Sequence, residues 1–280
     1  MFSIVLGSKK LFEAIVKKTN DDIWKYLESN YNKDEINKDL ELNSLVVAGS
    51  PTLSKSYGVS ISLQDFSNQI DYLVQLYQPK NVILISSASV YGLSDNTNKI
   101  FFEDSELLGN SEYALEKIHL ENLISNIAGI YNQMNFLILR PAGYYNCFNN
   151  NRRNSLIDRI LNFEYSPIKD NFKIKHNGKQ IRDFCNFDAL VYMILHFSWH
   201  ENKRLSIMNL STSQAFKICE IIEIYLPINI ITYLDCDERH IHSQLSNEFM
   251  LNQANDAFSD GTLKLVNQES EFKVRNKLNA

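Results

Sequence analysis

The sequence predicts an α/β protein with a doubly wound parallel sheet and a smaller C-terminal lobe. Short runs of branched apolar residues alternate with longer segments in which apolar residues recur every three to four positions. The short runs are apolar at every position, as expected for strands that are buried on both faces of a parallel sheet. Strands that alternate with helices imply right-handed crossovers, which place helices on both faces of one sheet.

Four strands are expected in the first half of the chain, over residues 2–6, 45–48, 82–85 and 136–139. A helix is expected over 66–77, because Phe66, Ile70 and Leu73 fall on one stripe and Pro79 ends the pattern before the next strand. A second long helix is expected over 111–131, with its buried side formed by Leu120, Leu123, Ile124 and Ile127.

The last third of the sequence is less regular. We expect a buried helix over 188–200, a strand over 205–210 and an amphipathic helix over 213–226. No repeat and no linker-like stretch separates this part from the rest. We therefore expect domains at about 1–146 and 147–280, with the chain crossing between them.

Composition narrows the class of protein. The chain has 280 residues, of which 44% are hydrophobic and 22% charged, which is typical of a globular protein with a large core. The net charge of −5 argues against a nucleic-acid partner. No window approaches the roughly 20 apolar residues of a membrane span, and no signal-peptide pattern opens the sequence. Four widely spaced cysteines indicate reduced thiols. We expect a cytoplasmic protein with no membrane partner.

The first chemical signal is Tyr113-Ala-Leu-Glu-Lys117 near the start of the helix over 111–131. Residues four apart share one face of a helix, so the phenol and the ammonium group are neighbours. A nearby cation favours phenolate and would lower the pKa of Tyr113 from its reference of about 10. Tyr113 is therefore a candidate general acid and base. The alternative is an ordinary helix surface, because such pairs are common by chance.

The second signal is the run of hydroxyls that follows the strand over 82–85, in Ser86-Ser-Ala-Ser-Val-Tyr-Gly92. Ligands of open α/β sheets bind beyond the carboxyl ends of the strands. Ser87 could there hydrogen-bond the same substrate oxygen that Tyr113 protonates. The alternative is that these serines only form a turn.

With these motifs the chain resembles the extended short-chain dehydrogenase/reductases, in their nucleotide-sugar epimerase, dehydratase and reductase branch. Residues 86–92 are similar to that branch's Ser-Ser-x-x-Val-Tyr-Gly. Residues 139–145 resemble Leu-Arg-Pro-x-x-x-Tyr-Gly, and residues 178–188 resemble Gly-x-x-x-Arg-Asp-Phe-x-x-Val-x-Asp. The resemblance covers roughly residues 1–7 and 45–226.

The resemblance implies a Rossmann-type sheet that binds NAD or NADP and a smaller lobe that binds a nucleotide sugar. It assigns catalysis to Ser87, Tyr113 and Lys117. Arg182 would bind the nucleotide diphosphate as a bidentate cation, although a surface ion pair near Asp183 is the alternative. The implied cofactor-binding residues are Gly7, Lys9, Lys10, Ala48, Ser86, Tyr113, Lys117 and Pro141. The implied substrate-binding residues are Ser87, Ala88, Ser89, Gly143 and Arg182. No metal is expected.

The glycine-rich loop departs from the family's Gly-x-x-Gly-x-x-Gly. Only Gly7 remains, while Lys10 and Glu13 occupy the other two positions, where side chains should crowd the diphosphate and loosen helix packing. The segment 18–44 is short for a second βαβ unit, and no acidic residue stands out there as a ligand of the adenosine ribose. Lys9 and Lys10 could contact phosphate, including the extra phosphate of NADP, or could be solvated charges.

Two further departures bear on the substrate. Gly143 occupies a position where many relatives have a substrate-binding Asn. Ala88 and Ser89 replace the Asp-Glu pair of the 4,6-dehydratases, so we do not expect dehydration. His240-Ile-His242 lacks a third ligand for a metal site.

Three functions follow from these observations. The first is an epimerase that acts by reversible hydride transfer on a nucleotide hexose. The second is an NADPH-dependent reductase of a nucleotide 4-keto-sugar, and the third is a family member that has lost its cofactor and acts as a binding or regulatory module. The resemblance also implies a homodimer formed through the helices at about 60–77 and 111–131.

Overall fold

The structure is a computed structural model. It describes residues 1–20, 22–33, 36–37, 40–56, 58–94, 99–145, 172–175, 178–199, 204–211, 215–225, 231–234 and 242–246. Contacts divide the chain into two units that exchange segments. The first unit comprises Met1–Gly92, Glu106–Arg140 and Val191–Met208, and the second comprises Leu93–Ser105, Pro141–Leu190 and Asn209–Ala280.

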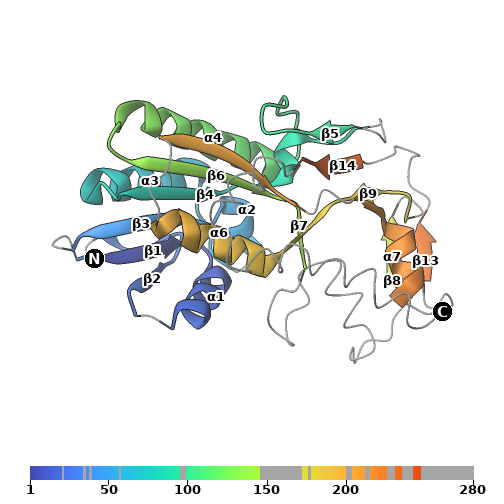
Figure 1. The fold of residues 1–280 in the computed structure, drawn as a ribbon, viewed down its shortest axis with the longest axis horizontal. Helices are drawn as coiled ribbons and strands as arrows, with labels where there is room; N and C mark the ends of the chain where they lie inside the picture. Colours follow the sequence, from blue (N-terminus) through green and yellow to red (C-terminus); the bar gives the residue numbers. More distant parts are fainter. Residues whose placement is uncertain are drawn as a thin grey trace. The chain divides into compact units, whose positions relative to one another are not determined.

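The core of the first unit is a six-stranded parallel sheet with the order β11-β6-β4-β3-β1-β2 (Figure 1). Its strands are β1 (Phe2–Leu6), β2 (Trp24–Leu27), β3 (Leu42–Val47), β4 (Asn81–Ile85), β6 (Asn135–Pro141) and β11 (Leu205–Leu210). The chain runs from β1 outward to β2 and then returns to β3 on the other side of β1. The strand order therefore reverses between β1 and β3, the position where sheets of this kind bind ligands.

Helices cover both faces of this sheet. On one face, α3 (Leu63–Tyr77) and α4 (Glu112–Ile130) bury apolar stripes against alternate strand residues. On the other, α1 (Lys9–Thr19) lies beside α6 (Phe187–Trp199), with Lys18 Nζ 4.5 Å from the ring centroid of Tyr192. The sheet is therefore doubly wound, as the sequence predicts, and every strand expected within it is present.

Strand β2 and the segment after it were not predicted. The described residues of 28–41 form turns, and Tyr31, Ile36 and Leu40 pack against the same core as α3. The Tyr31 hydroxyl donates to the Gln69 carbonyl of α3 at 3.2 Å. This short segment thus stands in place of a full second βαβ unit.

The second unit consists of small sheets and one described helix. Strand β7 (Gly143–Tyr145) pairs with β10 (Phe184–Asn186), and β8 (Phe172–Lys175) pairs with β13 (Ile231–Leu234). A third sheet has the order β12 (Phe216–Lys217), β9 (Ile181–Arg182), β14 (His242–Leu245) and β5 (Ile100–Phe101).

The helix expected over 213–226 is placed differently. Helix α7 spans Ile218–Tyr225 and follows strand β12, so it begins five residues later than expected. Phe216 and Lys217 pair with Arg182 and Ile181 of β9, which commits their backbone to a sheet instead of the helix. Within the ranges described above, no helix is long and apolar enough to cross a membrane.

Candidate active site

Ser87, Tyr113 and Lys117 lie together in the first unit. Ser87 follows β4 and caps the short 3-10 helix η2 (Ala88–Tyr91), and its Oγ accepts from the Ser89 amide at 3.2 Å. The Ser87 hydroxyl lies close enough to the Tyr113 phenol to lower the pKa of Tyr113. The Nζ of Lys117 lies 5.8 Å from the centroid of the Tyr113 ring. The structure therefore brings together the three residues to which the resemblance assigns catalysis.

Two local features place Tyr113 beside the end of β4. Ser111 caps α4 by accepting from the Ala114 amide at 3.1 Å, which puts Tyr113 in the first helical turn. Gly109, just before this turn, contacts η2 so closely that an added Cβ would lie 2.4 Å from the Ser89 carbonyl oxygen. Only a glycine permits this approach, and the approach brings the start of α4 to Ser87.

Lys117 is buried and bound to the ends of two strands. Only 1% of the residue is exposed, and its Nζ donates to the carbonyls of Gly49 at 3.0 Å and Ile85 at 2.8 Å. Burial lowers the pKa of Lys117 to about 8, against the opposing effect of the carboxylates of Glu116 and Glu121. An ammonium group has three N–H donors, and the third finds no acceptor within the described part of the chain. It is available for a ligand hydroxyl.

The pKa of Tyr113 departs from the expectation. The pKa of Tyr113 is raised, because burial outweighs the lowering effect of the Ser87 hydroxyl and the Glu116 carboxylate adds to the effect of burial. The expectation that Lys117 lowers the pKa of Tyr113 is wrong for this structure, in which the ammonium group of Lys117 is bound by the carbonyls of Gly49 and Ile85. Tyr113 is thus a phenol at neutral pH and is ready to donate a proton.

Glu116 is a buried part of the site that the sequence analysis missed. Both of its carboxylate oxygens accept from the Thr52 amide at 3.1 Å, and one also accepts from the Thr52 hydroxyl at 2.9 Å. Thr52 lies in the first turn of α2 (Pro51–Ser56). Together with the bond from Lys117 to Gly49, this contact fastens the β3–α2 loop to α4. The sequence offered one signal for Glu116, because residues three apart lie on the same side of a helix and Glu116 follows Tyr113 by three residues.

The loop after β1 fits a dinucleotide better than the sequence suggests. Gly7 has a φ of +86°, and an added Cβ would lie 2.7 Å from the Cα of Gly49, so the two loops touch where the strand order reverses. Ser8 caps α1, whose first turn carries Lys9 and Lys10 and no acidic residue. A helix N-terminus with this charge suits a phosphate.

The expected loosening of helix packing at the third glycine position is wrong. Glu13 is exposed and points away from the sheet, because Leu11 and Ile15 form the buried face of α1. Lys10, at the second position, is half-buried. Of the two side chains that replace glycines here, Lys10 is therefore the one that could crowd a diphosphate.

Glu28 is an acidic residue in the segment where none was recognised. It directly follows β2, and its side chain is exposed. In dinucleotide-binding folds an acidic residue about 20 residues beyond the first glycine binds the adenosine ribose, and Glu28 stands in that relation to Gly7. The signal was hidden because β2 is only four residues long and contains Lys25.

The remaining expected residues of the first unit lie near the same strand ends. Ala48 is buried, and its amide donates to the Leu6 carbonyl at 2.9 Å. The hydroxyl of Ser86 is bound within the protein, by Glu121. Ala88 and Ser89 lie half-buried on η2, and the buried Oγ of Ser89 has no hydrogen-bond partner among the residues that the structure describes.

Pro141, Gly143 and Arg182 belong to the second unit. An added Cβ on Gly143 would lie 3.3 Å from the Phe184 ring, which explains the small residue there. Arg182 is half-buried and makes no ion pair within the described ranges; burial lowers its pKa. Asp183 instead accepts from the amides of Phe184 and Leu245, at 2.8 and 3.2 Å. Within the described ranges, Arg182 and Asp183 form no ion pair with each other.

Of the two histidines in His240-Ile-His242, His242 begins strand β14 and His240 lies outside the described residues. Among the residues that are described, no three His, Cys, Asp or Glu side chains are placed to hold a metal ion.

The fold and the site define a doubly wound, dinucleotide-binding type of α/β protein. Residues 66–210, more than half of the chain, match the model of the NAD dependent epimerase/dehydratase family. The chain belongs to this family, which confirms the resemblance and, at the level of the family, the nicotinamide cofactor. No curated protein matches the sequence.

Solved structures with the same fold include three nucleotide-sugar proteins. MoeE5 in complex with UDP-glucuronic acid and NAD is 15% identical, with a TM-score of 0.70 over 90% of this chain and 92% of that one. A dTDP-glucose 4,6-dehydratase from Bacillus anthracis, with NAD, is 14% identical, with a TM-score of 0.70 over 97% of each chain. A UDP-N-acetylglucosamine 4-epimerase from Methanobrevibacter ruminantium is 17% identical, with a TM-score of 0.69 over 95% of each chain. At these identities the likeness shows the Rossmann-type fold.

Proposed function

We propose that this protein is an NAD-dependent epimerase of a nucleotide hexose. The proposal rests chiefly on one observation: the Ser87 hydroxyl lies close enough to the Tyr113 phenol to lower its pKa, and the buried ammonium group of Lys117 lies 5.8 Å from the centroid of the same ring. A phenol and a hydroxyl that lie this close can both hydrogen-bond one substrate oxygen.

Each of the three side chains has a separate task. Bound NAD supplies the hydride acceptor and donor. Because Tyr113 is a phenol in this structure, it must first release its proton. As the phenolate it would then take the proton of the sugar hydroxyl when that carbon is oxidised, and it would return that proton when the ketone is reduced from the opposite face. Ser87 holds the same oxygen. Lys117 offers its third N–H to a ribose hydroxyl, and Gly7 with the start of α1 receives the diphosphate.

Glu28 supports NAD over NADP as the cofactor. Its carboxylate at the end of β2 can accept hydrogen bonds from ribose hydroxyls but would repel a 2′-phosphate. An epimerase returns its hydride within one catalytic cycle and needs no supply of NADPH. The position of Glu28 therefore favours the epimerase over the NADPH-dependent reductase.

A nucleotide diphosphate is the proposed group at Arg182. A half-buried guanidinium with no carboxylate partner among the described residues suits bidentate binding of phosphate. The solved relatives bind UDP-glucuronic acid or act on UDP-N-acetylglucosamine, according to their names. Ala88 and Ser89 provide no acid–base pair, which leaves dehydration without support.

The reductase remains the second candidate because of one observation. The raised pKa of Tyr113 keeps it protonated at neutral pH, as an acid that protonates a ketone must be. The third candidate, a module that has lost its cofactor, is supported only by the half-buried Lys10 in the glycine loop.

The direct test is product analysis with purified protein. Bound nucleotide is first released and identified; the protein is then incubated with NAD and UDP-glucose, UDP-N-acetylglucosamine or dTDP-glucose, and products are followed by proton NMR. Appearance of the C4 epimer without net NADH formation would support the proposal. Net consumption of NADPH with a 4-keto-sugar would support the reductase. If neither NAD nor NADP binds at millimolar concentration, the enzyme is excluded.

We also propose that the enzyme works in the cytoplasm as a homodimer. The exposed apolar side chains of α4, Leu115 at 55% and Ile130 at 72%, are consistent with contact to a second copy. Sedimentation that gives only monomer at micromolar concentration would contradict the dimer.

A further inference from the structure

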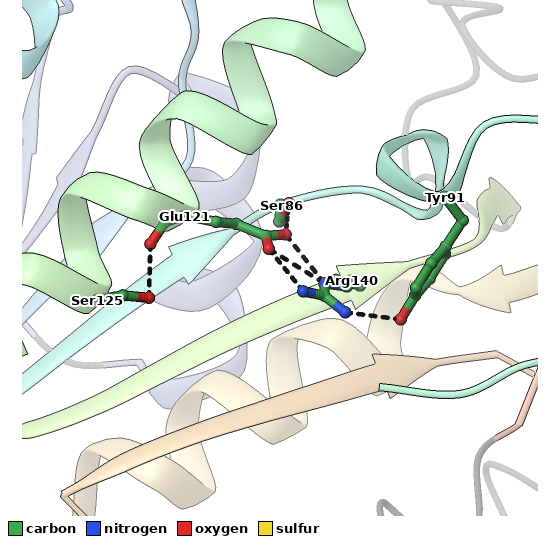
Figure 2. A network of polar contacts seen from close by, with 5 residues as sticks. All are labelled: Ser86, Tyr91, Glu121, Ser125 and Arg140. Carbon is green, nitrogen blue, oxygen red and sulfur yellow. Dashed lines mark hydrogen bonds and ion pairs between the residues drawn. The ribbon is translucent and has the colours of Figure 1, made fainter. Parts of the chain in front are cut away.

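A buried ion pair lies directly behind the proposed site, between Glu121 of α4 and Arg140 of β6 (Figure 2). Arg140 Nη2 donates to Glu121 Oε2 at 2.7 Å, and Nε donates to Oε1 at 3.0 Å. The two side chains are 4% and 3% exposed. Burial alone would lower the pKa of Arg140, but its bonds to Glu121 and Tyr91 outweigh this and raise the pKa. Arg140 is therefore charged.

Such a pair is a poor source of stability. Removing two charges from water costs about as much as their attraction returns, so a well-packed apolar pair would stabilise the fold equally well. What the ion pair provides instead is directed hydrogen bonds to defined neighbours.

Those neighbours lie on either side of Ser87. Ser86, the residue before it, donates from Oγ to Glu121 Oε1 at 2.5 Å. Tyr91, the last residue of η2, accepts at its hydroxyl from Arg140 Nη1 at 2.9 Å. Figure 2 shows both bonds converging on the one ion pair. The segment that carries Ser87 is thus tied at both ends.

The same ion pair is fixed to the residues that face Ser87. Glu121 follows Lys117 by one turn of α4 and Tyr113 by two turns, so all three lie on one side of the helix. Ser87 directly follows Ser86 and has extended backbone angles. When Ser86 is held by Glu121, the backbone of Ser87 is fixed relative to the helix that carries Tyr113.

We propose that Glu121 and Arg140 are positioning residues that hold Ser87 beside Tyr113, through the tethers at Ser86 and Tyr91. Their effect on catalysis rests on the proposed function; their effect on the Ser87 segment does not. The charge of Glu121 also counteracts the lowering of the pKa of Lys117 by burial.

Two single substitutions cut one tether each and leave the ion pair intact: Ser86→Ala and Tyr91→Phe. Ser125→Ala is the matched control, because Ser125 donates to the backbone carbonyl of Glu121 at 2.8 Å and touches neither tether. Hydrogen exchange followed by mass spectrometry should show faster exchange in peptides that cover 86–92 in both tether variants. Peptides from α4 and β6 should be unchanged, as should all peptides of the control.

Kinetics with the nucleotide sugar that the wild type turns over form the second arm. Misplacement of a reacting group by about 1 Å costs on the order of 100-fold in rate, so we expect kcat to fall about 10- to 100-fold in the tether variants. The KM for the sugar should change less than about 3-fold. Because loss of folded protein would also lower the apparent kcat at constant KM, kcat is calculated per folded protein, with the folded fraction measured by circular dichroism. The control should retain wild-type kcat.

The double variant Glu121→Leu with Arg140→Met distinguishes an effect on the position of Ser87 from an effect on the stability of the fold. An apolar pair should keep the melting temperature near that of the wild type while kcat remains low. Unchanged exchange in 86–92 in both tether variants would overturn the proposal, as would a double variant with wild-type kcat. If the wild type turns over no nucleotide sugar, the proposed function fails, and the exchange arm still decides whether the ion pair positions Ser87.

Discussion

The burial of Lys117 predicts an unusual dependence of stability on pH. Its pKa falls from 10.5 to about 8 on folding, mainly because burial disfavours the charged form. A difference of one in pKa corresponds to about 1.4 kcal/mol, so the protonated lysine costs the folded state about 3 kcal/mol. Between about pH 8 and 10.5 the unfolded chain binds more protons at this position than the folded chain. Stability from this group therefore rises with pH over that window.

The substitution Lys117→Met removes this dependence. The free energy of unfolding of the wild type, minus that of the variant, should rise by about 2 to 3 kcal/mol between pH 7 and pH 10. Subtracting the two free energies cancels the contribution of the other titrating groups. The loss of the bonds to Gly49 and Ile85 is the same at every pH, so it does not affect the change with pH. Urea unfolding followed by tryptophan fluorescence measures both proteins at each pH.

A lysine at the surface provides the control. Lys80 is exposed, so Lys80→Met should differ from the wild type by the same amount at every pH. A difference for Lys117→Met that stays constant with pH, or that falls as pH rises, would refute the reasoning that burial sets the pKa of this lysine.

Three further predictions concern the cofactor loop and the end of α4. Gly7→Ala should cost about 1 to 2 kcal/mol in urea unfolding and weaken NAD binding, since an added Cβ meets Gly49 at positive φ. Glu28→Arg should shift the ratio of NAD to NADP affinity by about 10-fold or more toward NADP in fluorescence titrations. Arg204→Ala should cost about 1 to 3 kcal/mol without changing NAD affinity, because it removes two bonds to the last carbonyls of α4.

The parts of the fold that could be predicted are those in which burial is one-sided or complete. Strand β4 is buried at all five positions, so only apolar residues and Asn81 occur there and the run is easily recognised. Strand β2 is the edge strand, and Lys25 is exposed within it. Its four residues make no apolar run, so the sequence did not reveal this strand. Without the strand, Glu28 could not be recognised as the acidic residue that follows it.

The site divides in the same way. Tyr113 and Lys117 follow from helical spacing, and Ser87 follows from its place at a strand end. Glu116 and Glu121 do not, because a glutamate on a helix is usually solvated. Their roles depend on partners elsewhere in the chain, Thr52 and Arg140, which only the fold brings to them.

The central claim is that Tyr113 exchanges the proton in a reaction that depends on a nicotinamide cofactor. The most direct measurement compares wild type and Tyr113→Phe in turnover of UDP-sugars with NAD, together with NAD affinity. The account predicts a loss of about 100- to 10,000-fold in kcat with an NAD dissociation constant within about 3-fold of the wild type. Wild-type turnover in the phenylalanine variant would contradict it.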